Sequence, residues 1–205
     1  ALLDIADDST ILLSQEIDTY YPEPGWAEQD PGDWMDALAA LIGAIVEVEK
    51  LAPEDIAAVG LSGITHCPIM MDAHDELLGR TIHITDGRSL VQARRLEERS
   101  GDIILERALN PVDVMWTLPM LAWVRERDRN RWDRVSSILF PKDYVRFMLT
   151  GSRLTDIIDA QGTLFFDPIK KKWDSSLTDL IGLDISLLPE LAEPGEVAGK
   201  VSKKG

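Results

Sequence analysis

The stretch IAAVGLSGITHCPIMMD occupies residues 56–72 and contains two short apolar runs. Ala57–Leu61 and Pro68–Asp72 each have the length and the apolar content of a buried strand. Small residues between the two runs let the connecting loop come close to a ligand. The stretch therefore predicts two strands of an α/β domain, with Thr65 and His66 in the loop that connects them.

The segment before this stretch predicts a β-hairpin followed by a helix. Ala1–Ile5 is apolar, and Ile11–Tyr21 alternates well enough to form the second strand of the hairpin. Asp30 can cap a helix that has a proline in its first turn, and apolar residues recur at helical spacing from Trp34 to about Lys50. Antiparallel strands followed by a helix and a further strand exclude a simple alternation of strands and helices.

The chain after residue 88 is predicted to be mainly helical. The apolar spacing indicates helices over Ser89–Ser100, Asp102–Leu109, Trp116–Arg127, Lys142–Leu149 and Asp174–Ile181, and short strands at Ile138–Phe140 and Leu164–Asp167. No repeat or low-complexity linker divides the sequence. The predicted fold class is therefore α/β, a single domain with helical excursions.

The chain of 205 residues is strongly acidic, with 36 Asp and Glu against 21 Lys and Arg and a formal net charge of -15. This balance argues against nucleic-acid binding and against adsorption to anionic membranes. No apolar run approaches the roughly 20 residues that span a bilayer. The one cysteine, Cys67, cannot form an internal disulfide, which favours a reducing, cytoplasmic compartment.

Two polar segments are candidate ligand sites. Thr65 and His66 offer a hydroxyl and an imidazole to sugar hydroxyls, or they belong to a tight turn with a partly exposed histidine. Asp86 can accept a hydrogen bond from a polyol hydroxyl, or it caps the next helix and pairs with Arg88. Taken alone, each segment favours the second, structural alternative. No Walker A motif, Gly-x-Gly-x-x-Gly motif or zinc-ligand spacing occurs in the sequence.

Two further segments leave alternatives open. The helix that begins near Trp116 carries a stripe of tryptophan and methionine that would wall a sugar site or pack on the core. Asp156 and Asp159 lie three residues apart in a small-residue context. They would act as acid/base or metal-binding groups, or they would belong to a polar capping loop.

Short motifs follow one another in a consistent order along nearly the whole chain. They are Gly25–Pro31 with Trp34, Ile56–Gly63 with His66, Thr85–Arg88, Leu139–Tyr144, Leu149–Gly151, Asp159–Thr163, Leu188–Pro189 and Glu193–Val197. Together they resemble the N-terminal domain of the FGGY family of carbohydrate kinases, and most of all its xylulokinase members. Each motif is weakly specific by itself, whereas the ordered set is specific.

This resemblance implies a kinase of two actin-like (ribonuclease H-like) domains with a cleft between them. Residues 1–205 would supply the first domain, a mixed sheet flanked by helices that binds the sugar. The implied reaction is ATP-dependent phosphorylation of a sugar or polyol hydroxyl, with a xylulose-like ketose as the leading acceptor and with Mg²⁺ as cofactor. The expected partners are this substrate and ATP, and a homodimer is left open. A non-catalytic sugar-binding or regulatory module is the alternative function.

The resemblance also places the substrate contacts. The residues expected to line the sugar are Thr65, His66, Thr85, Asp86 and Met115. Positions 84 and 85 hold Ile and Thr where xylulokinases usually have Trp and Asn, which favours a ketose or polyol related to xylulose.

Two motifs of the family would lie outside this sequence. The Gly-Ile-Asp-x-Gly-Thr strand and turn, which handles phosphate and magnesium, would precede Ala1, and the motif with the catalytic aspartate would follow Gly205. We therefore expect the natural protein to continue in both directions, with ATP and Mg²⁺ bound mainly by those segments. We also expect the first strand to be missing from the sheet and no catalytic residue within residues 1–205.

Overall fold

The computed structural model describes residues 2–3 and 10–202 and is rich in helix. The helices are α1 (Pro31–Glu49), α2 (Leu90–Ala108), α3 (Thr117–Arg127), α4 (Arg129–Trp132), α5 (Pro141–Thr150), α6 (Ile157–Gln161) and α7 (Ser175–Thr178). Single 3-10 turns are η1 (Pro53–Asp55), η2 (Asp179–Ile181) and η3 (Ile185–Leu187). Within the described residues, no helix is both long enough and apolar enough to cross a membrane.

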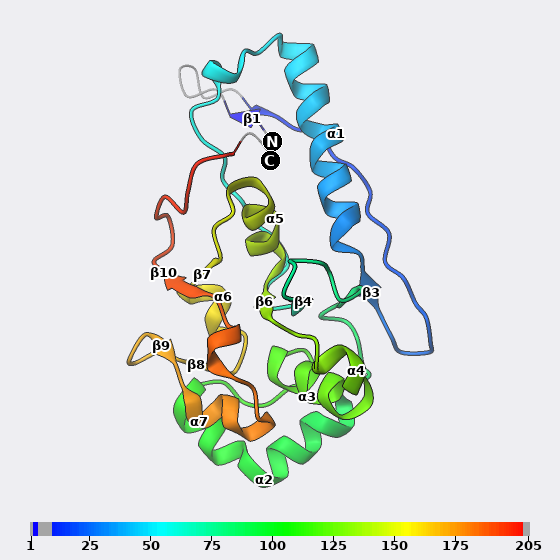
Figure 1. Cartoon of the computed structure of the whole chain (residues 1–205), viewed down its shortest axis with the longest axis vertical. Coiled ribbons are helices and arrows are strands. Elements are labelled where there is room, and N and C mark those ends of the chain that lie inside the picture. Colours follow the sequence, from blue (N-terminus) through cyan, green and yellow to red (C-terminus); the bar gives the residue numbers. More distant parts are fainter. Residues whose placement is uncertain (1, 4–9, 203–205) are drawn as a thin grey trace.

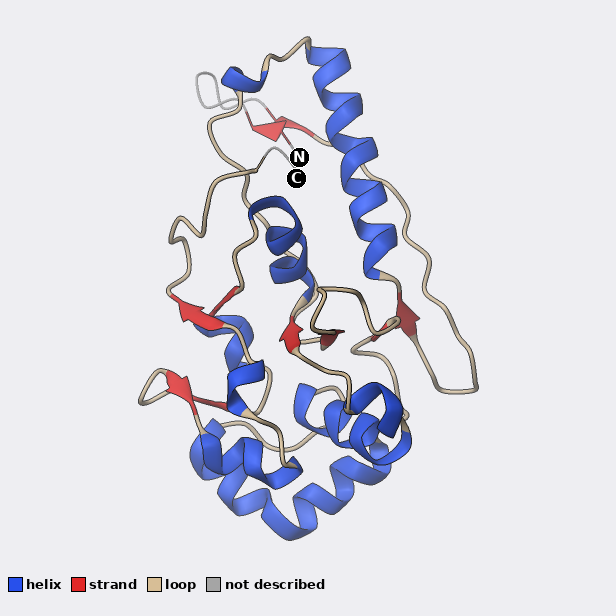
Figure 2. Ribbon diagram, in the orientation of Figure 1, coloured by secondary structure: helices blue, strands red, loops and turns tan. Residues whose placement is uncertain are grey.

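Short strands form five pairs in the described part of the chain (Figure 2). The antiparallel pairs are β1 (Leu2–Leu3) with β2 (Thr10–Ile11), β3 (Glu28–Gln29) with β5 (Thr81–Ile82), β4 (Ile69–Met71) with β6 (Ser137–Leu139), and β8 (Phe166–Asp167) with β9 (Lys172–Trp173). The parallel pair is β7 (Leu154–Asp156) with β10 (Glu190–Ala192). Parallel and antiparallel pairs both occur, as a mixed α/β fold requires. Each pair is a separate two-stranded sheet.

The molecule is elongated (Figure 1). Helix α1 and the β1–β2 pair lie at one end, and α2, α3, α4 and α7 gather at the other end. The remaining strands and α5 and α6 lie between these two groups. The loops that carry the predicted site residues run through this middle region.

One of the two strands predicted from residues 56–72 forms and the other does not. β4 pairs with β6, and all three of its residues are buried. Ala57–Leu61 forms no strand, and Val59 in the middle of this segment is 48% exposed. The prediction for Ala57–Leu61 is wrong, because an apolar run becomes a strand only beside a partner, and none of the described residues pairs with it.

The N-terminal predictions are confirmed in part. β1 and β2 pair antiparallel, as a hairpin requires, but the second strand ends at Ile11 and residues 12–19 enter no ladder. The connection between the strands, residues 4–9, lies outside the described residues. Helix α1 begins as predicted, since the Asp30 carboxylate accepts a hydrogen bond from the Gly32 N–H at 2.9 Å.

Two predicted helices are a single helix in the structure. α2 continues through Gly101, where a break was expected between Ser100 and Asp102. A glycine inside a helix reduces helix stability by about 1 kcal/mol relative to alanine. The helical turns on both sides can outweigh this cost. The other predicted helices correspond to α3, α5 and α7 with η2, and the short strands to β6 and β8.

Among the described residues, two apolar clusters pack these elements together. The larger one packs α2, α3 and β6, and in α3 the residues Met120, Leu121 and Val124 have no exposed surface. The smaller one joins β4 and β6 to Tyr144 and to the start of α1 at Trp34. Loops 64–68, 83–89 and 110–116 lead directly into these buried elements, so the core restricts where each loop can lie.

Candidate functional site

His66 is the most constrained of the predicted site residues. Its backbone has a φ of 48°, in the left-handed region, and only 3% of its surface is exposed. The Thr117 hydroxyl at the start of α3 donates to the His66 carbonyl at 2.5 Å, and the Trp116 ring lies 4.9 Å from the imidazole. The predicted tight turn is present, but the histidine within it is buried and not partly exposed.

The burial of His66 sets its protonation state. Desolvation lowers the pKa of His66 to about 4, against the opposing effect of a hydrogen bond with the Met115 backbone. The imidazole is therefore neutral at pH 7, and one ring nitrogen can accept a hydrogen bond. Its Nε2 atom has no hydrogen-bond partner among the described residues. A buried polar atom without a partner is costly unless a ligand or water supplies one.

Thr65 and Met115 lie beside His66. Thr65 is exposed, and its carbonyl accepts a hydrogen bond from Cys67 N–H at 2.7 Å, which closes the turn around the histidine. Met115 is half-buried and its backbone contacts the imidazole. The fold thus brings together three of the five predicted residues, from loops that are about 50 positions apart in the sequence.

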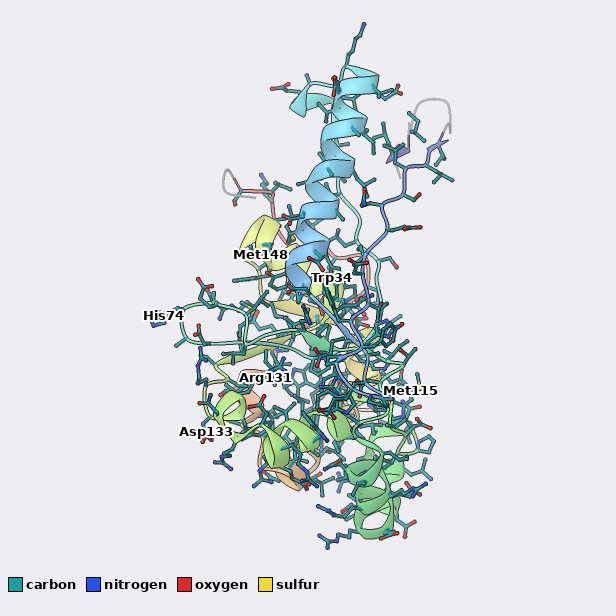
Figure 3. All side chains as sticks on the ribbon, turned by 90° about the vertical axis from the view of Figure 1, so that its right-hand side faces the viewer. Trp34, His74, Met115, Arg131, Asp133 and Met148 are labelled. Atoms are coloured by element: carbon teal, nitrogen blue, oxygen red, sulfur yellow. The ribbon has the colours of Figure 1, made fainter. Side chains whose placement is uncertain are left out.

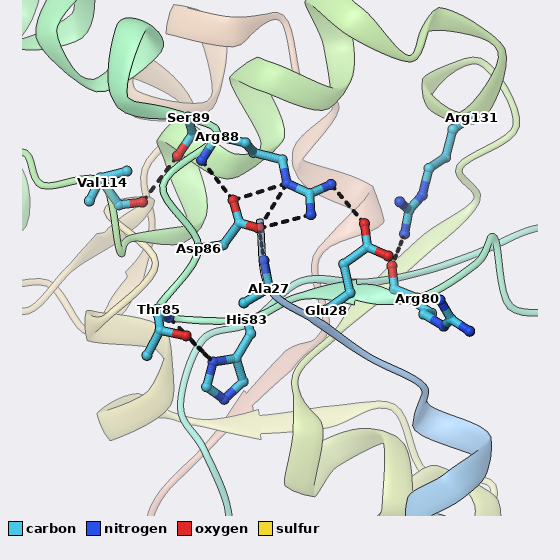
Figure 4. Close-up of polar contacts among 10 residues, drawn as sticks. All are labelled: Ala27, Glu28, Arg80, His83, Thr85, Asp86, Arg88, Ser89, Val114 and Arg131. Atoms are coloured by element: carbon cyan, nitrogen blue, oxygen red, sulfur yellow. Dashed lines mark hydrogen bonds and ion pairs between the residues drawn. The ribbon is translucent and has the colours of Figure 1, made fainter. Parts of the chain in front are cut away.

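Thr85 and Asp86 belong to the neighbouring loop. The Thr81 hydroxyl donates a hydrogen bond to the Pro68 carbonyl at 2.9 Å, which links the strand before this loop to the His66 turn. Thr85 is exposed and its hydroxyl lies 2.8 Å from Nδ1 of His83 (Figure 4). Asp86 is buried. Its carboxylate accepts hydrogen bonds from the Ala27 N–H at 2.5 Å and from the Arg88 N–H. Contact between Asp86 and the sugar therefore stays a prediction, whereas the structure shows that Asp86 holds the loop through these two backbone hydrogen bonds.

Arg88 closes a buried ion-pair cluster around Asp86. Its guanidinium donates to both Asp86 oxygens and pairs with Glu28 at 2.8 Å (Figure 4). The Trp26 ring centroid lies 3.8 Å from the guanidinium carbon, and that of Trp123 lies 5.1 Å from it. Bidentate pairing and ring stacking both require the planar fork of arginine. The predicted Asp86–Arg88 pair is confirmed, and it ties the loop after residue 25 to α3.

A second polar cluster, which we call the lysine cluster, lies at the start of α5. Lys142 Nζ lies 2.7 Å from Asp143 Oδ1, 2.9 Å from Asp156 Oδ2 and 2.8 Å from Asp159 Oδ2. Arg146 adds an ion pair to Asp143 at 2.8 Å. The sequence pattern pointed to Asp156 and Asp159 but not to Lys142, although Lys142 lies within the Leu139–Tyr144 motif.

The charges of the lysine cluster shift one another's pKa values. Burial opposes the charge of Lys142, but the carboxylates of Asp143 and Asp159 outweigh it and raise the lysine pKa. Burial raises the pKa of Asp159, although Lys142 acts to lower it. Burial alone would raise the pKa of Asp156 also, but Lys142 and backbone N–H groups bring it below its ordinary value. An ammonium group thus occupies the centre of the carboxylates.

This arrangement does not fit a magnesium site. Among residues 2–3 and 10–202 there is no group of three His, Cys, Asp or Glu side chains that could hold a metal ion. The lysine takes the central position that a cation would need. Of the two alternatives for Asp156, the capping one is present, since its carboxylate accepts from the N–H groups of Ile158 and Asp159 and begins α6.

Helix α6 connects the lysine cluster to His66. Asp159 stands in its middle, and Gly162 follows its last residue. A Cβ atom on Gly162 would overlap Nδ1 of His66 and lie 2.9 Å from its Cγ. The absence of a side chain at residue 162 therefore makes room for the imidazole. Gly162 lies within the Asp159–Thr163 motif, but nothing in the sequence pattern predicts its contact with His66.

Comparison with known proteins shows the family of this chain. The family model described as the N-terminal domain of the FGGY family of carbohydrate kinases matches residues 5–205. The chain belongs to the FGGY family of carbohydrate kinases. The ordered motifs from Gly25 to Val197 thus correctly predicted the family.

Individual FGGY proteins cover nearly the whole chain. A xylulose kinase from Lactococcus lactis is 35% identical over 187 residues, which are 91% of this chain and 37% of that protein. The crystal structure of a xyloylose kinase from Brucella ovis is 32% identical with a TM-score of 0.91, over 98% of this chain and 41% of that one. A gluconate kinase from Lactobacillus acidophilus is 25% identical with a TM-score of 0.91, over 98% and 40% of the two chains.

These likenesses establish the fold of this FGGY chain. It has the actin-like (ribonuclease H-like) α/β fold of the sugar kinases, as the sequence analysis predicted. The chain spans about two-fifths of the length of the relatives that it matches.

Proposed function

We propose that the whole protein phosphorylates a hydroxyl of a xylulose-like ketose with ATP, and that residues 1–205 supply its sugar-binding part. The observation that carries the proposal is the buried imidazole of His66, flanked by Thr65 and Met115, whose Nε2 atom lacks a hydrogen-bond partner among the described residues. The 35% identical xylulose kinase from Lactococcus lactis supports a ketose as the acceptor.

The neutral His66 suits the recognition of a sugar. Its Nε2 atom can accept a hydrogen bond from a sugar hydroxyl, whereas a protonated imidazole could only donate. Exposed Thr65 and Thr85 add hydroxyl groups that both donate and accept. The chain thereby orients the acceptor, which is a large part of the catalysis of phosphoryl transfer. We assign no catalytic base to the described residues.

ATP and Mg²⁺ are proposed as the phosphoryl donor and the cofactor of the whole protein. Bound Mg²⁺ would supply charge neutralisation for the transferred phosphoryl group. The lysine cluster is not assigned to either, because its carboxylates already surround an ammonium group. We also propose a cytoplasmic location, on the basis of the single buried Cys67. Whether the protein forms a homodimer is to be decided by measuring its oligomeric state.

The test is an acceptor panel. The natural protein, with ATP and Mg²⁺, is assayed against D-xylulose, other ketoses, gluconate and glycerol, and a xylulose-like ketose should give the highest kcat/KM. The His66→Asn variant, which keeps a residue tolerant of the left-handed backbone, should raise KM for the sugar more than KM for ATP. Phosphorylation of gluconate or glycerol alone would overturn the ketose assignment. Sugar binding without turnover on any acceptor would favour the non-catalytic module instead.

A further inference from the structure

A groove with an unusual concentration of arginine lies between α2, α3 and η2, away from the His66 site. Its volume is about 300 Å³, and its lining includes Leu96, Ala122 and Ile181. It belongs to the end of the molecule where α2, α3 and α7 gather (Figure 1). Arg125 lies eight residues along α3 from Thr117, which contacts His66, and this corresponds to roughly 12 Å along a helix axis.

The groove is basic although the chain carries a net charge of -15. Four arginines line it, together with a single carboxylate, that of Glu126; the arginines are Arg95, Arg99, Arg125 and Arg129. Glu126 is already engaged, because Oε1 pairs with Arg95 at 2.7 Å and Oε2 accepts from the Gln92 amide at 2.8 Å. The lining therefore carries four guanidinium groups against one carboxylate, and among the described residues only Arg95 has its ion-pair partner within the groove.

Two of these arginines have no acidic partner among the described residues. Arg129 pairs with Asp133 at 2.8 Å, whereas Arg99 and Arg125 form no ion pair in that part of the chain. The Arg125 guanidinium lies against Gly182, which has a positive φ of 58° and no side chain to displace it. Two free guanidinium forks at one groove are the donor set that binds a phosphate group, because each can make paired, charge-assisted hydrogen bonds.

One lining residue of the groove carries an unused acceptor in its buried side chain. Gln92 is 2% exposed and lines the groove, and its Oε1 atom has no hydrogen-bond partner among the described residues. The amide orientation follows from its other end, since Nε2 donates to Glu126. The phosphate group of a monoester dianion has no hydroxyl to offer such an acceptor, whereas the sugar part of a sugar phosphate has several.

We propose that this groove binds the phosphate monoester of a small polyhydroxylated compound. The phosphate lies between Arg99 and Arg125, and a hydroxyl of the same ligand donates to Gln92 Oε1. The site does not depend on the proposed kinase reaction, because none of its residues belongs to the His66 site.

The test measures binding to the natural protein by calorimetry at constant ionic strength. The probes are glucose 6-phosphate, inorganic phosphate and glucose. We expect glucose 6-phosphate to bind more tightly than phosphate, and glucose to show no saturable binding at the same site. Equal affinity for phosphate and glucose 6-phosphate would contradict the hydroxyl contact to Gln92, and no saturable binding of either phosphate would overturn the proposal.

A matched pair of variants separates the groove from general charge. Arg99→Gln with Arg125→Gln removes one unpaired arginine from α2 and one from α3. Arg94→Gln with Arg127→Gln removes one exposed arginine from each of the same helices outside the groove. The groove pair should weaken glucose 6-phosphate binding about tenfold per arginine, and the control pair should leave it unchanged. Equal losses in the two pairs would overturn the proposal, and matching circular dichroism would verify that both variants fold.

Discussion

The ammonium nitrogen of Lys142 lies 2.8 Å from Oδ2 of Asp159. The two residues come from α5 and α6, and Asp143 and Asp156 complete the ring of carboxylates around the lysine. Asp143 has no exposed surface and Asp159 has 2%. Lys142 therefore compensates several carboxylates, and Arg146 adds a second cation only at Asp143. This makes the lysine more consequential for stability than an exposed pair would be.

Replacing Lys142 by Met should destabilise the protein strongly. The loss should be about 3 to 5 kcal/mol in the free energy of unfolding, because the buried Asp159 carboxylate would be left without its cation and Asp143 would keep only Arg146. Urea unfolding followed by tryptophan fluorescence measures it. Lys170→Met is the matched control, since Lys170 is half exposed and pairs with a single Asp167, and its effect should be much smaller. Equal losses of unfolding free energy in the two variants would show that the lysine cluster stabilises the protein no more than an exposed ion pair does.

Gly162→Ala should displace the His66 imidazole. A Cβ at residue 162 would meet the ring, and overpacking of this kind costs about 1 to 3 kcal/mol. Gly43→Ala is the control, because Gly43 is an exposed residue inside α1, and no atom lies within 4 Å of the place that its Cβ would take. That substitution should stabilise the protein by up to about 1 kcal/mol. The contact would be disproved by a histidine NMR spectrum that is unchanged in Gly162→Ala.

His66 should make the protein less stable in mild acid. Its pKa is about 4 in the folded protein, below the ordinary value of 6.5, so the unfolded chain binds more protons between these two values. This contribution to stability is complete above pH 6.5 and is lost as the pH falls toward 4. The loss should reach up to about 3 kcal/mol.

The His66 prediction is measured by unfolding at a series of pH values. His66→Asn removes the titrating group and should flatten the slope between pH 6.5 and 4. His74→Asn is the control, since His74 is exposed and lies on the opposite side of the molecule from Met115, the neighbour of His66 (Figure 3). Burial also lowers the pKa of His83, so some slope should remain in every variant. Identical slopes for the two asparagine variants would contradict the prediction.

Arg88→Lys should destabilise the protein although it keeps the positive charge. A lysine cannot donate to both Asp86 oxygens while stacking on Trp26, so about 2 to 4 kcal/mol should be lost. Thermal unfolding measures the change. Arg129→Lys is the control, because it alters an exposed i, i+4 ion pair with Asp133 in the same way. Its thermal unfolding midpoint should hardly change. A stable Arg88→Lys protein would mean that charge alone is needed between the two tryptophans.

Much of the local structure could be predicted from spacing and caps. Asp30 and Pro31 predict the start of α1, and the apolar residues of β4 predict a buried strand. These features depend on neighbours within a few positions of the chain. The strand expected at Ala57–Leu61 fails because strand formation also needs a partner, and no described residue provides one.

The candidate site was predictable only as a list of residues. Thr65 and His66 were predicted from their polar groups and from the family resemblance, and Met115 from the resemblance alone; the structure brings the three together. The closed environment of Asp86 was not predictable, because its partner Ala27 is 59 residues away in the sequence. Lys142 was missed for the same reason, since its carboxylate partners in β7 and α6 follow more than ten positions later.

The sequence by itself determined the family and the order of its motifs, because a series of short matches is specific even when each is weak. It also determined the helices whose caps and apolar spacing are local. Only the tertiary structure decided that His66 is buried and neutral, that Gly162 makes room for its ring, and that Lys142 sits among carboxylates. Burial and charge pairing arise between residues distant in the chain, so a protonation state can be assigned only after the fold brings them into contact.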